Sequence, residues 1–510
     1  MPATPVTVES QDPRYDALKR GRNARFPSSD SEAASRILLC SNAAETAEGL
    51  QRVVTAGLRP TVRSGNHCYE DFVVNNPHGA IIDLSLHNSV DSASGHPIRI
   101  APGATLGEVY TALYKRSLLT IPAGTCATVG SGGHISGGGY GLLSRLYGLT
   151  CDWITGVDIL TVDANGKVIE RQTDKLHNPD LFRACRGAGG GNFGVITNFY
   201  FDKLPPAPRE VAETSMSIPW SSLDEAKFTK FLTIYGDYWE GRAKDPDTWG
   251  LFTILDISPS NGGAGRLGMS IQFCNPDGTA SDLSVLREFC NKFADLHPVF
   301  AQRGGGGGGG GGFRRDAALG TSTDPNQITR RAWIDATVGG GGGGGQRAKY
   351  KSAYMKQSFT SAECSAIFRF MNSPDLDPTG VTLAIDSYGG ATNNPDRILD
   401  TSMAQRSSVM KLQYLGSWRD EKQDASRIKF MDDFYTAIYS GPQVPDQYKG
   451  TPFGPRYEGC YMNYPDVAML RYSHWPQLFY GPGDLYPFLQ RVKKQYDPNN
   501  IFHSSMSVRA

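Results

Sequence analysis

The sequence of 510 residues lacks the features that mark several classes of protein. Its 51 basic residues balance its 51 acidic residues, so no basic field is available for a nucleic-acid backbone or an anionic membrane. It has no run of about eighteen apolar residues, and its first residues show no basic region followed by an apolar stretch. We therefore expect no nucleic-acid partner, no membrane span and a cytoplasmic location.

The nine cysteines lack a pattern as well. Their number is odd, and no pair has CxxC spacing or the ligand spacing of a zinc site. A disulfide framework is therefore not predicted, and most of these thiols are expected to be small buried side chains. His134 has no accompanying cluster of carboxylates or thiols, which favours a structural, hydrogen-bonding histidine over a metal ligand. No metal is predicted.

Two nucleotide-binding fingerprints are also missing. No segment places GxGxxG between a strand and a helix with an acidic residue about twenty positions later, and none matches GxxxxGK[ST], so neither a Rossmann site nor a P-loop is predicted. Two glycine runs, at residues 304–312 and 339–345, are purer than natural flexible linkers usually are. We draw no inference about the fold from residues 303–346.

The length predicts two lobes with a ligand-binding cleft between them. In the first lobe, residues 157–170 have the pattern of two strands joined at Ala164-Asn165-Gly166, where Asn-Gly favours a tight hairpin. The proline-rich stretch at residues 205–208 precedes longer alternating segments such as 249–257, which predict an antiparallel sheet with flanking helices. Residues 486–498 predict a helix that ends at a proline and returns to the first lobe.

Three glycine-rich segments are candidates for a ligand-binding site. They lie at residues 63–68, 122–141 and 186–195. Glycine allows backbone amides to approach an anion closely, and successive amides in turns form anion-binding nests. Several such loops indicate a diphosphate held mainly by main chain, and hence a dinucleotide. For any one of them alone, a tight turn in a β-rich protein is the favoured interpretation.

Five motifs in order resemble those of the berberine-bridge-enzyme-like branch of the vanillyl-alcohol-oxidase flavoprotein family. They are Arg63-Ser-Gly-Asn-His67, Pro122-Ala-Gly-Thr-Cys126, Gly137-Gly-Gly-Tyr-Gly141, Gly189-Gly-Gly-Asn-Phe-Gly194 and Tyr461-Met-Asn-Tyr-Pro-Asp466. The resemblance extends from about residue 30 to the C-terminus. Within the branch, the chain most resembles bacterial oxidases that tailor antibiotics such as aclacinomycin, tirandamycin and the hexose of glycopeptides.

The resemblance implies an α+β fold and a division of the chain. Residues 1–206 would form a two-subdomain FAD-binding lobe of the PCMH type, and residues 207–480 a substrate lobe whose antiparallel sheet covers the flavin. Residues 481–510 would return to the FAD-binding lobe.

The resemblance further implies FAD bonded covalently to His67 through its 8α carbon and to Cys126 through ring carbon C6. A neutral imidazole and a thiolate are suitable nucleophiles. Outside these motifs, His67 would be interpreted as a histidine in a turn and Cys126 as a buried free cysteine. Asn66 departs from the glycine of many relatives. The other expected cofactor-binding residues are Arg63, Ser64, Gly65, Asn66, Thr128, Val129, Gly130, Gly132, Gly133, Gly138, Tyr140, Gly191, Gly194, Val195, Tyr461 and Asn463.

Oxidation of an alcohol requires a base for the hydroxyl proton, and Tyr464 is the predicted one. Tyrosine has an ordinary pKa of about 10, which must be lowered for this role. Tyr388 and Tyr140 are expected to line the same cavity, although a half-buried sheet aromatic is nearly as good an interpretation of each. Tyr461 and Tyr464 are three residues apart, and an odd spacing places two residues on opposite faces of a regular strand. Both can face the substrate only if a bulge or turn interrupts the strand.

The expected activity is therefore that of a bicovalent FAD-dependent oxidase. It would convert a sugar or polyketide hydroxyl of a small natural product into a carbonyl, with dioxygen reduced to hydrogen peroxide. A mono- or oligosaccharide oxidase is an alternative with the same cofactor chemistry. A flavin-free binding protein on the same fold is an alternative of another class. The sequence predicts neither the individual substrate nor the oligomeric state.

Overall fold

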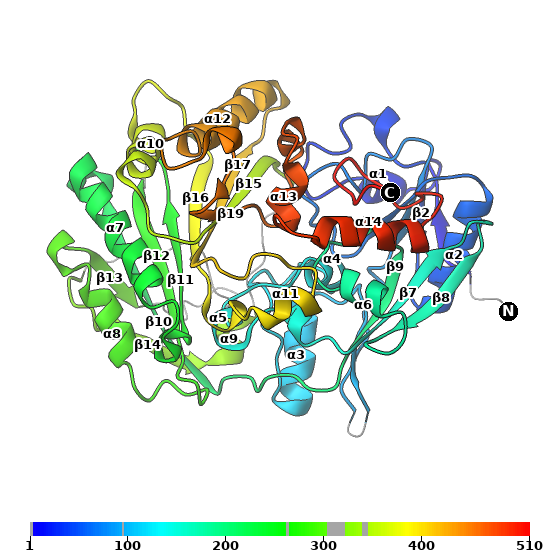
Figure 1. Ribbon diagram of the computed structural model, residues 1–510, viewed down its shortest axis with the longest axis horizontal. Coiled ribbons are helices and arrows are strands. Elements are labelled where there is room, and N and C mark those ends of the chain that lie inside the picture. Colours follow the sequence, from blue (N-terminus) through cyan, green and yellow to red (C-terminus); the bar gives the residue numbers. More distant parts are fainter. Residues whose placement is uncertain (1–3, 94–95, 262–264, 303–321, 339–344) are drawn as a thin grey trace.

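Two lobes lie side by side in the computed structural model (Figure 1). Glycine run 304–312 and most of the second run, 339–344, lie outside the described residues. The structure describes residues 4–93, 96–261, 265–302, 322–338 and 345–510.

The first lobe contains two sheets, as expected for two subdomains. The smaller sheet has the order β1-β2-β4-β3, and β4 pairs in parallel with both β2 and β3. Helix α2 makes the crossover between β2 and β3. The bounds are β1 Val6–Val8, β2 Arg36–Leu39, α2 Ala43–Thr55, β3 Pro60–Arg63 and β4 Ala80–Asp83.

The second sheet of this lobe is antiparallel, with the order β5-β6-β9-β7-β8. Its β7–β8 hairpin confirms the turn predicted at Asn165-Gly166, where Gly166 has a φ of 77°. The elements of this region are β5 Val90–Asp91, β6 Ile98–Ile100, α3 Leu106–Ser117, α4 Ser131–Ser136, β7 Gly156–Val162, β8 Val168–Thr173, α6 Pro179–Ala184 and β9 Val195–Phe201.

The second lobe is built on one ten-stranded antiparallel sheet, and it confirms the predicted α+β class. Its central order is β10-β12-β11-β16-β17-β15. Its strands are β10 Glu210–Pro219, β11 Leu251–Ile257, β12 Arg266–Phe273, β13 Val299–Gln302, β14 Thr329–Ala332, β15 Arg347–Met355, β16 Val381–Ser387, β17 Met410–Trp418, β18 Phe453–Gly454 and β19 Tyr457–Glu458.

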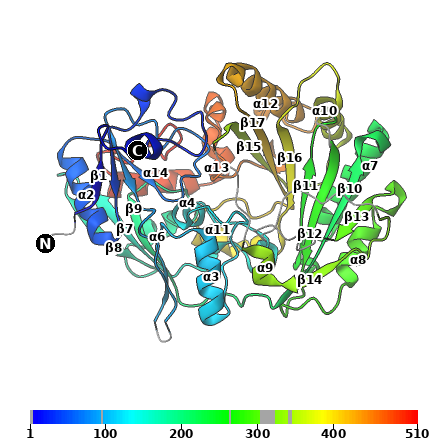
Figure 2. The ribbon, with the colours of Figure 1, turned by 180° about the vertical axis from the view of Figure 1, so that it is seen from behind.

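Four helices cover the face of this sheet that is turned away from the first lobe (Figure 2). They are α7 Glu225–Gly241, α8 Ser284–Asn291, α10 Ser361–Asn372 and α12 Asp424–Ile438. The opposite face is left to meet the first lobe, so the strands β16 and β17 at its centre can form one wall of a site between the lobes.

The end of the chain crosses back to the first lobe. After α13 (Trp475–Tyr480), α14 (Leu485–Tyr496) packs on α6. The fully buried Lys493 ammonium donates to Asp497 at 2.6 Å and to the Asn192 carbonyl at 2.7 Å. This bonding fixes the helix end against a glycine-rich loop of the first lobe.

Candidate active site

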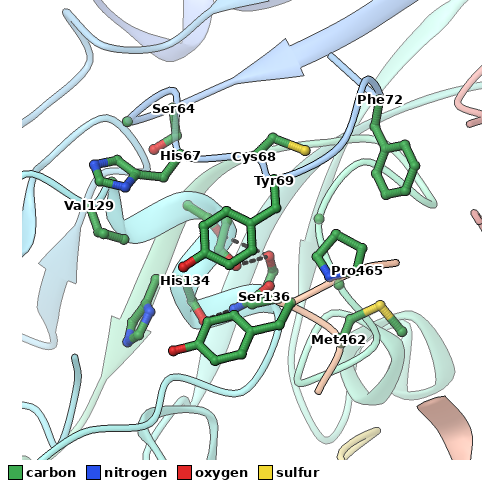
Figure 3. A pocket seen from close by; sticks show the side chains of 18 of the residues that line it. Ser64, His67, Cys68, Tyr69, Phe72, Val129, His134, Ser136, Met462 and Pro465 are labelled. Carbon is green, nitrogen blue, oxygen red and sulfur yellow. Dashed lines mark hydrogen bonds between the residues drawn. The ribbon is translucent and has the colours of Figure 1, made fainter. Parts of the chain in front are cut away.

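A cavity of about 980 Å³ lies between the lobes, lined by the three glycine-rich loops, the sheet of the second lobe and the segment 461–465. Figure 3 shows the Tyr69 ring within it, with His67 and His134 to one side and Met462 and Pro465 to the other. No group of three metal-ligating side chains occurs among the described residues. None of the helices in these ranges combines the length and apolarity needed to cross a membrane.

Glycine brings two loops of the first lobe together at the cavity. A Cβ on Gly65 would lie 2.1 Å from the Gly130 nitrogen, and one on Gly130 would lie 2.1 Å from the Ser64 hydroxyl. A Cβ on Gly133 or Gly191 would instead meet nothing within 4 Å. The packed glycines hold the loops together, and the open ones leave backbone facing the cavity. This cradle fits a dinucleotide bound by main chain.

The two candidate nucleophiles converge on one hydroxyl. His67 Nε2 lies 3.1 Å from Thr128 Oγ1, and Cys126 Sγ lies 3.4 Å from the same oxygen. Burial, with a further contribution from Arg22, lowers the pKa of His67 to about 4. Its imidazole is therefore neutral near pH 7 and keeps a nitrogen lone pair for bond formation. The donor set fits a flavin bonded at two ring positions.

The backbone conformation and side-chain hydrogen bond of Asn66 account for an asparagine at this position, where many relatives have glycine. Its φ is 58°, in the left-handed region where asparagine is the least costly residue after glycine. Its side-chain amide donates to the Arg20 carbonyl at 3.0 Å. The loop that carries His67 therefore keeps a glycine-type turn.

Two predicted residues are held by contacts within the protein. The Arg63 guanidinium forms a buried ion pair with Asp83 at 2.6 Å, although parts of its side chain line the cavity. Asn463 donates from its side chain to the His134 carbonyl at 3.1 Å. His134 Nε2 accepts the Gly124 N–H at 3.0 Å, and burial, followed by Lys411, lowers its pKa to about 4. His134 thus hydrogen-bonds as expected.

A turn places both tyrosines of the fifth motif at the cavity. The Tyr464 N–H donates to the Tyr461 carbonyl at 2.9 Å, and the ring centroids are 5.0 Å apart. Both residues line the cavity. Because the segment turns before Pro465, the odd spacing does not separate the two rings.

Lys411, on β17, is the central charge of the opposite wall. Its ammonium lies 3.4 Å from the Tyr464 hydroxyl and 4.6 Å from the centre of that ring. It pairs with Asp386 on β16 at 3.1 Å. Gln413, two residues along β17, donates to the Tyr69 hydroxyl at 3.0 Å. The second oxygen of Asp386 and the side-chain oxygen of Gln413 are buried without a protein hydrogen-bond partner. Each can therefore accept a hydrogen bond from a bound ligand.

The structure corrects the prediction for Tyr388, which does not line the cavity. Its side chain is fully buried, and its hydroxyl donates to the Gln405 carbonyl at 3.0 Å. Tyr140 does line the cavity, but its hydroxyl donates to the Ser387 carbonyl at 2.6 Å. Burial raises the pKa of both phenols well above the usual value. Neither phenol has the free hydroxyl or the lowered pKa of a base.

The structure brings most of the other predicted site residues together at the cavity wall. The exceptions are Thr128, Gly138 and Val195, which do not line it. Gly138 packs against Met403, and Val195 lies in the core of the first lobe, so both are behind the wall. The lining residues among those predicted are Arg63, Ser64, Gly65, Asn66, His67, Cys126, Val129, Gly130, Gly132, Gly133, Tyr140, Gly191, Gly194, Tyr461, Asn463 and Tyr464.

The sequence reasoning missed Lys411, Gln413 and Asp386. The available signal was polar side chains at alternate positions of otherwise apolar strands, since Lys411 and Gln413 flank Leu412. A period of two marks one face of a strand, and a buried lysine requires a charged partner.

A main-chain cradle, two neighbouring nucleophiles and a lysine beside a cavity tyrosine are the components of a flavin-dependent oxidoreductase. Comparisons with known proteins agree. Residues 34–171 match the family model described as FAD binding domain, and residues 460–509 match the one described as berberine and berberine like.

The similarity to characterised relatives covers nearly the full chain. Aclacinomycin-N/aclacinomycin-A oxidase of Streptomyces galilaeus is 32% identical, over 99% of this chain and 90% of its own. Hexose oxidase of Chondrus crispus is 30% identical, over 98% of this chain and 94% of its own length. The chain therefore belongs to the berberine-bridge-enzyme-like family, and it is an FAD-dependent oxidoreductase.

Solved structures show the same fold. The oxidoreductase of the terminal step of gilvocarcin biosynthesis, in complex with pregilvocarcin, superposes with a TM-score of 0.86 at 27% identity, covering 99% of this chain and 100% of that one. A glycopeptide hexose oxidase complexed with teicoplanin gives 0.85 at 29% identity, covering 100% of both chains.

Proposed function

We propose that this protein is a bicovalent FAD-dependent oxidase that converts a sugar or polyketide hydroxyl of a small natural product into a carbonyl. The observation that carries the proposal is the convergence of His67 Nε2 and Cys126 Sγ on one hydroxyl, at 3.1 and 3.4 Å. Two nucleophiles so close can both bond to one flavin, at its 8α carbon and at ring carbon C6. His67 and Cys126 would hold the FAD, and the glycine loops would bind its diphosphate.

When bound, FAD would supply a hydride acceptor for the alcohol carbon, with dioxygen as the final oxidant and hydrogen peroxide as its product. Tyr464 Oη takes the hydroxyl proton of the substrate. Tyr464 acts as a phenolate, which the Lys411 ammonium 3.4 Å away stabilises, and it becomes a neutral phenol when it takes the proton. Asp386 holds Lys411 in place through its ion pair.

The substrate class is supported by the wall opposite the flavin cradle. The unpartnered oxygens of Asp386 and Gln413 accept hydrogen bonds, which a substrate with several hydroxyl groups supplies. The names of the relatives agree, since they include an oxidase of aclacinomycin and a complex with teicoplanin. The same acceptors, with the 30% identity to a hexose oxidase, favour a mono- or oligosaccharide oxidase as the second candidate.

Covalent attachment is tested by the mass of the intact, denatured polypeptide made with ample FAD. We expect one added FAD, and peptide mapping should find it on both His67 and Cys126. An unmodified mass, with all FAD released by acid, would contradict the proposal and leave a protein that binds FAD without a bond.

The base is tested with Tyr464→Phe. Because the phenol oxygen is lost while the ring is kept, we expect anaerobic flavin reduction by substrate to slow by about a hundredfold or more, with an unchanged visible spectrum. A panel of glycosides and polyketide alcohols, screened by flavin bleaching, identifies the substrate. Unchanged reduction in the variant would remove Tyr464 from the mechanism.

A further inference from the structure

Thr128 has an unusual position relative to the two nucleophiles. It is exposed, and it does not line the cavity. Its hydroxyl is nevertheless the atom that connects His67, on the loop after β3, with Cys126, on the loop before α4. The hydroxyl therefore joins two loops that are distant in sequence, at the point where each carries its nucleophile.

The backbone of the turn does not need this hydroxyl. The Val129 N–H donates to the Cys126 carbonyl at 3.1 Å, and the Gly107 N–H donates to the Ala127 carbonyl at 3.0 Å. These main-chain bonds fix the loop without the Thr128 side chain. The hydroxyl lies 3.1 and 3.4 Å from the two nucleophiles and is not needed to shape the turn, so it is available to act on them.

The chemistry of a hydroxyl limits how it can serve both neighbours. It has one proton to donate and two lone pairs to accept with. If Thr128 donates to the Cys126 sulfur, its oxygen accepts a hydrogen bond from His67 Nε2–H. This tautomer leaves the lone pair on His67 Nδ1, the other ring nitrogen, free to form a bond.

We propose that Thr128 is a positioning residue for the covalent attachment of FAD, because its hydroxyl orients His67 for bonding through Nδ1 and holds the Cys126 sulfur beside it. This inference rests on the proposed bicovalent attachment. Because Thr128 is exposed, it can also pass the proton that His67 Nε2 loses to solvent water.

The attachment balances with dioxygen as oxidant. Each linkage breaks one C–H bond of FAD and one N–H or S–H bond of the protein, and it forms one C–N or C–S bond. Two protons and two electrons are released each time, and one molecule of dioxygen takes them up as hydrogen peroxide. The bicovalent product therefore requires two molecules of dioxygen.

The test compares Thr128→Val with the wild-type protein. Valine keeps the shape of threonine and removes the hydroxyl, and the exposed position makes a folding defect small. After expression with ample FAD, intact mass gives the fraction of chains with covalent FAD, and peptide mapping gives the fraction linked at each residue. We expect both linkages to form about tenfold more slowly, as loss of one hydrogen bond predicts.

Two controls separate the hydroxyl from the rest of the side chain. Thr128→Ser keeps the hydroxyl and should restore both linkages. Thr7→Val makes the same change at an exposed position of β1 that does not line the cavity, and it should leave linkage at the wild-type level. If Thr128→Val yields little folded protein, Thr128→Ala provides the same comparison.

The outcomes distinguish this inference from the proposed function. A wild-type protein without covalent FAD would contradict bicovalent attachment itself. A doubly linked wild-type protein together with equally fast linkage in Thr128→Val or Thr128→Ala would overturn the role of Thr128 alone. Linkage through His67 Nε2 in the mapped peptide would also overturn it, because that atom is the one assigned to Thr128.

Discussion

The two walls of the cavity differ in what builds them. The wall from the first lobe is largely backbone, where loops touch at Gly65 and Gly130 and lie open at Gly133 and Gly191. The wall from the second lobe consists of side chains on a sheet, with the Lys411 ammonium at its centre. The first wall suits a cofactor shared by many enzymes, whereas the second can change its side chains without changing the fold.

The walls are joined by buried charges beside the cavity. Lys349, on β15, pairs with Glu70 of the first lobe at 2.7 Å and with Asp466 at 2.6 Å. Asp466 also pairs with Lys351 at 2.6 Å. Although burial opposes the shift, the ammonium groups of Lys351 and Lys349 lower the pKa of Asp466. Asp466 follows Tyr464 by two residues, so this cluster holds the segment of Tyr464, the proposed base, between the lobes.

Lys349→Met should have the largest effect, because it removes a partner from buried carboxylates of both lobes. Breaking a buried ion pair costs about 3–5 kcal/mol of unfolding free energy, which denaturant unfolding measures. Lys429→Met on α12 is the matched control, since its pair with Asp433 is 74% and 50% exposed and should contribute less than about 1 kcal/mol. Equal losses in the two variants would show that the cluster does not join the lobes.

Lys411→Met tests whether the second wall acts in the reaction. Without the ammonium 3.4 Å from the Tyr464 hydroxyl, we expect anaerobic flavin reduction to slow by about tenfold to a hundredfold, as loss of a charged hydrogen bond predicts. Covalent FAD, measured by mass, should remain, because the first wall is intact. Lys411→Arg keeps the charge and should recover part of the rate; a wild-type rate in Lys411→Met would refute the assigned role.

Gly133→Ala should have the smallest effect on stability and a selective effect on the cofactor. The added methyl group meets no protein atom within 4 Å, and alanine favours a helix over glycine by about 1 kcal/mol. Unfolding of the FAD-free protein should therefore be unchanged or improved, while FAD content falls, because the methyl group enters the cradle. Gly241→Ala, equally open but on α7, should leave FAD content unchanged. Full FAD content in Gly133→Ala would place the cofactor elsewhere.

The sequence predicted the first wall better than the second for a physical reason. Glycine spacing, the Asn165-Gly166 turn and the helix that ends before Pro498 are local signals, and the structure contains each of these elements. The partners of Lys411 and Lys349 depend on which strands become neighbours, and this is a tertiary property. Tyr388 was misplaced for a similar reason: it follows the end of β16 at Ser387, and its hydroxyl bonds to the carbonyl of Gln405, a contact that the local sequence does not reveal. The domain limits at residues 206 and 480 stay predictions.

The return of the chain to the first lobe has a consequence for the order of folding. Residues 502–504, 506 and 507 line the cavity, and the Val508 N–H donates to the Asn192 side chain at 2.9 Å. A polypeptide in which this segment has not yet docked lacks part of the pocket wall. Completion of the pocket is therefore a late step of folding, because it waits for the contacts of residues 502–508 with the first lobe.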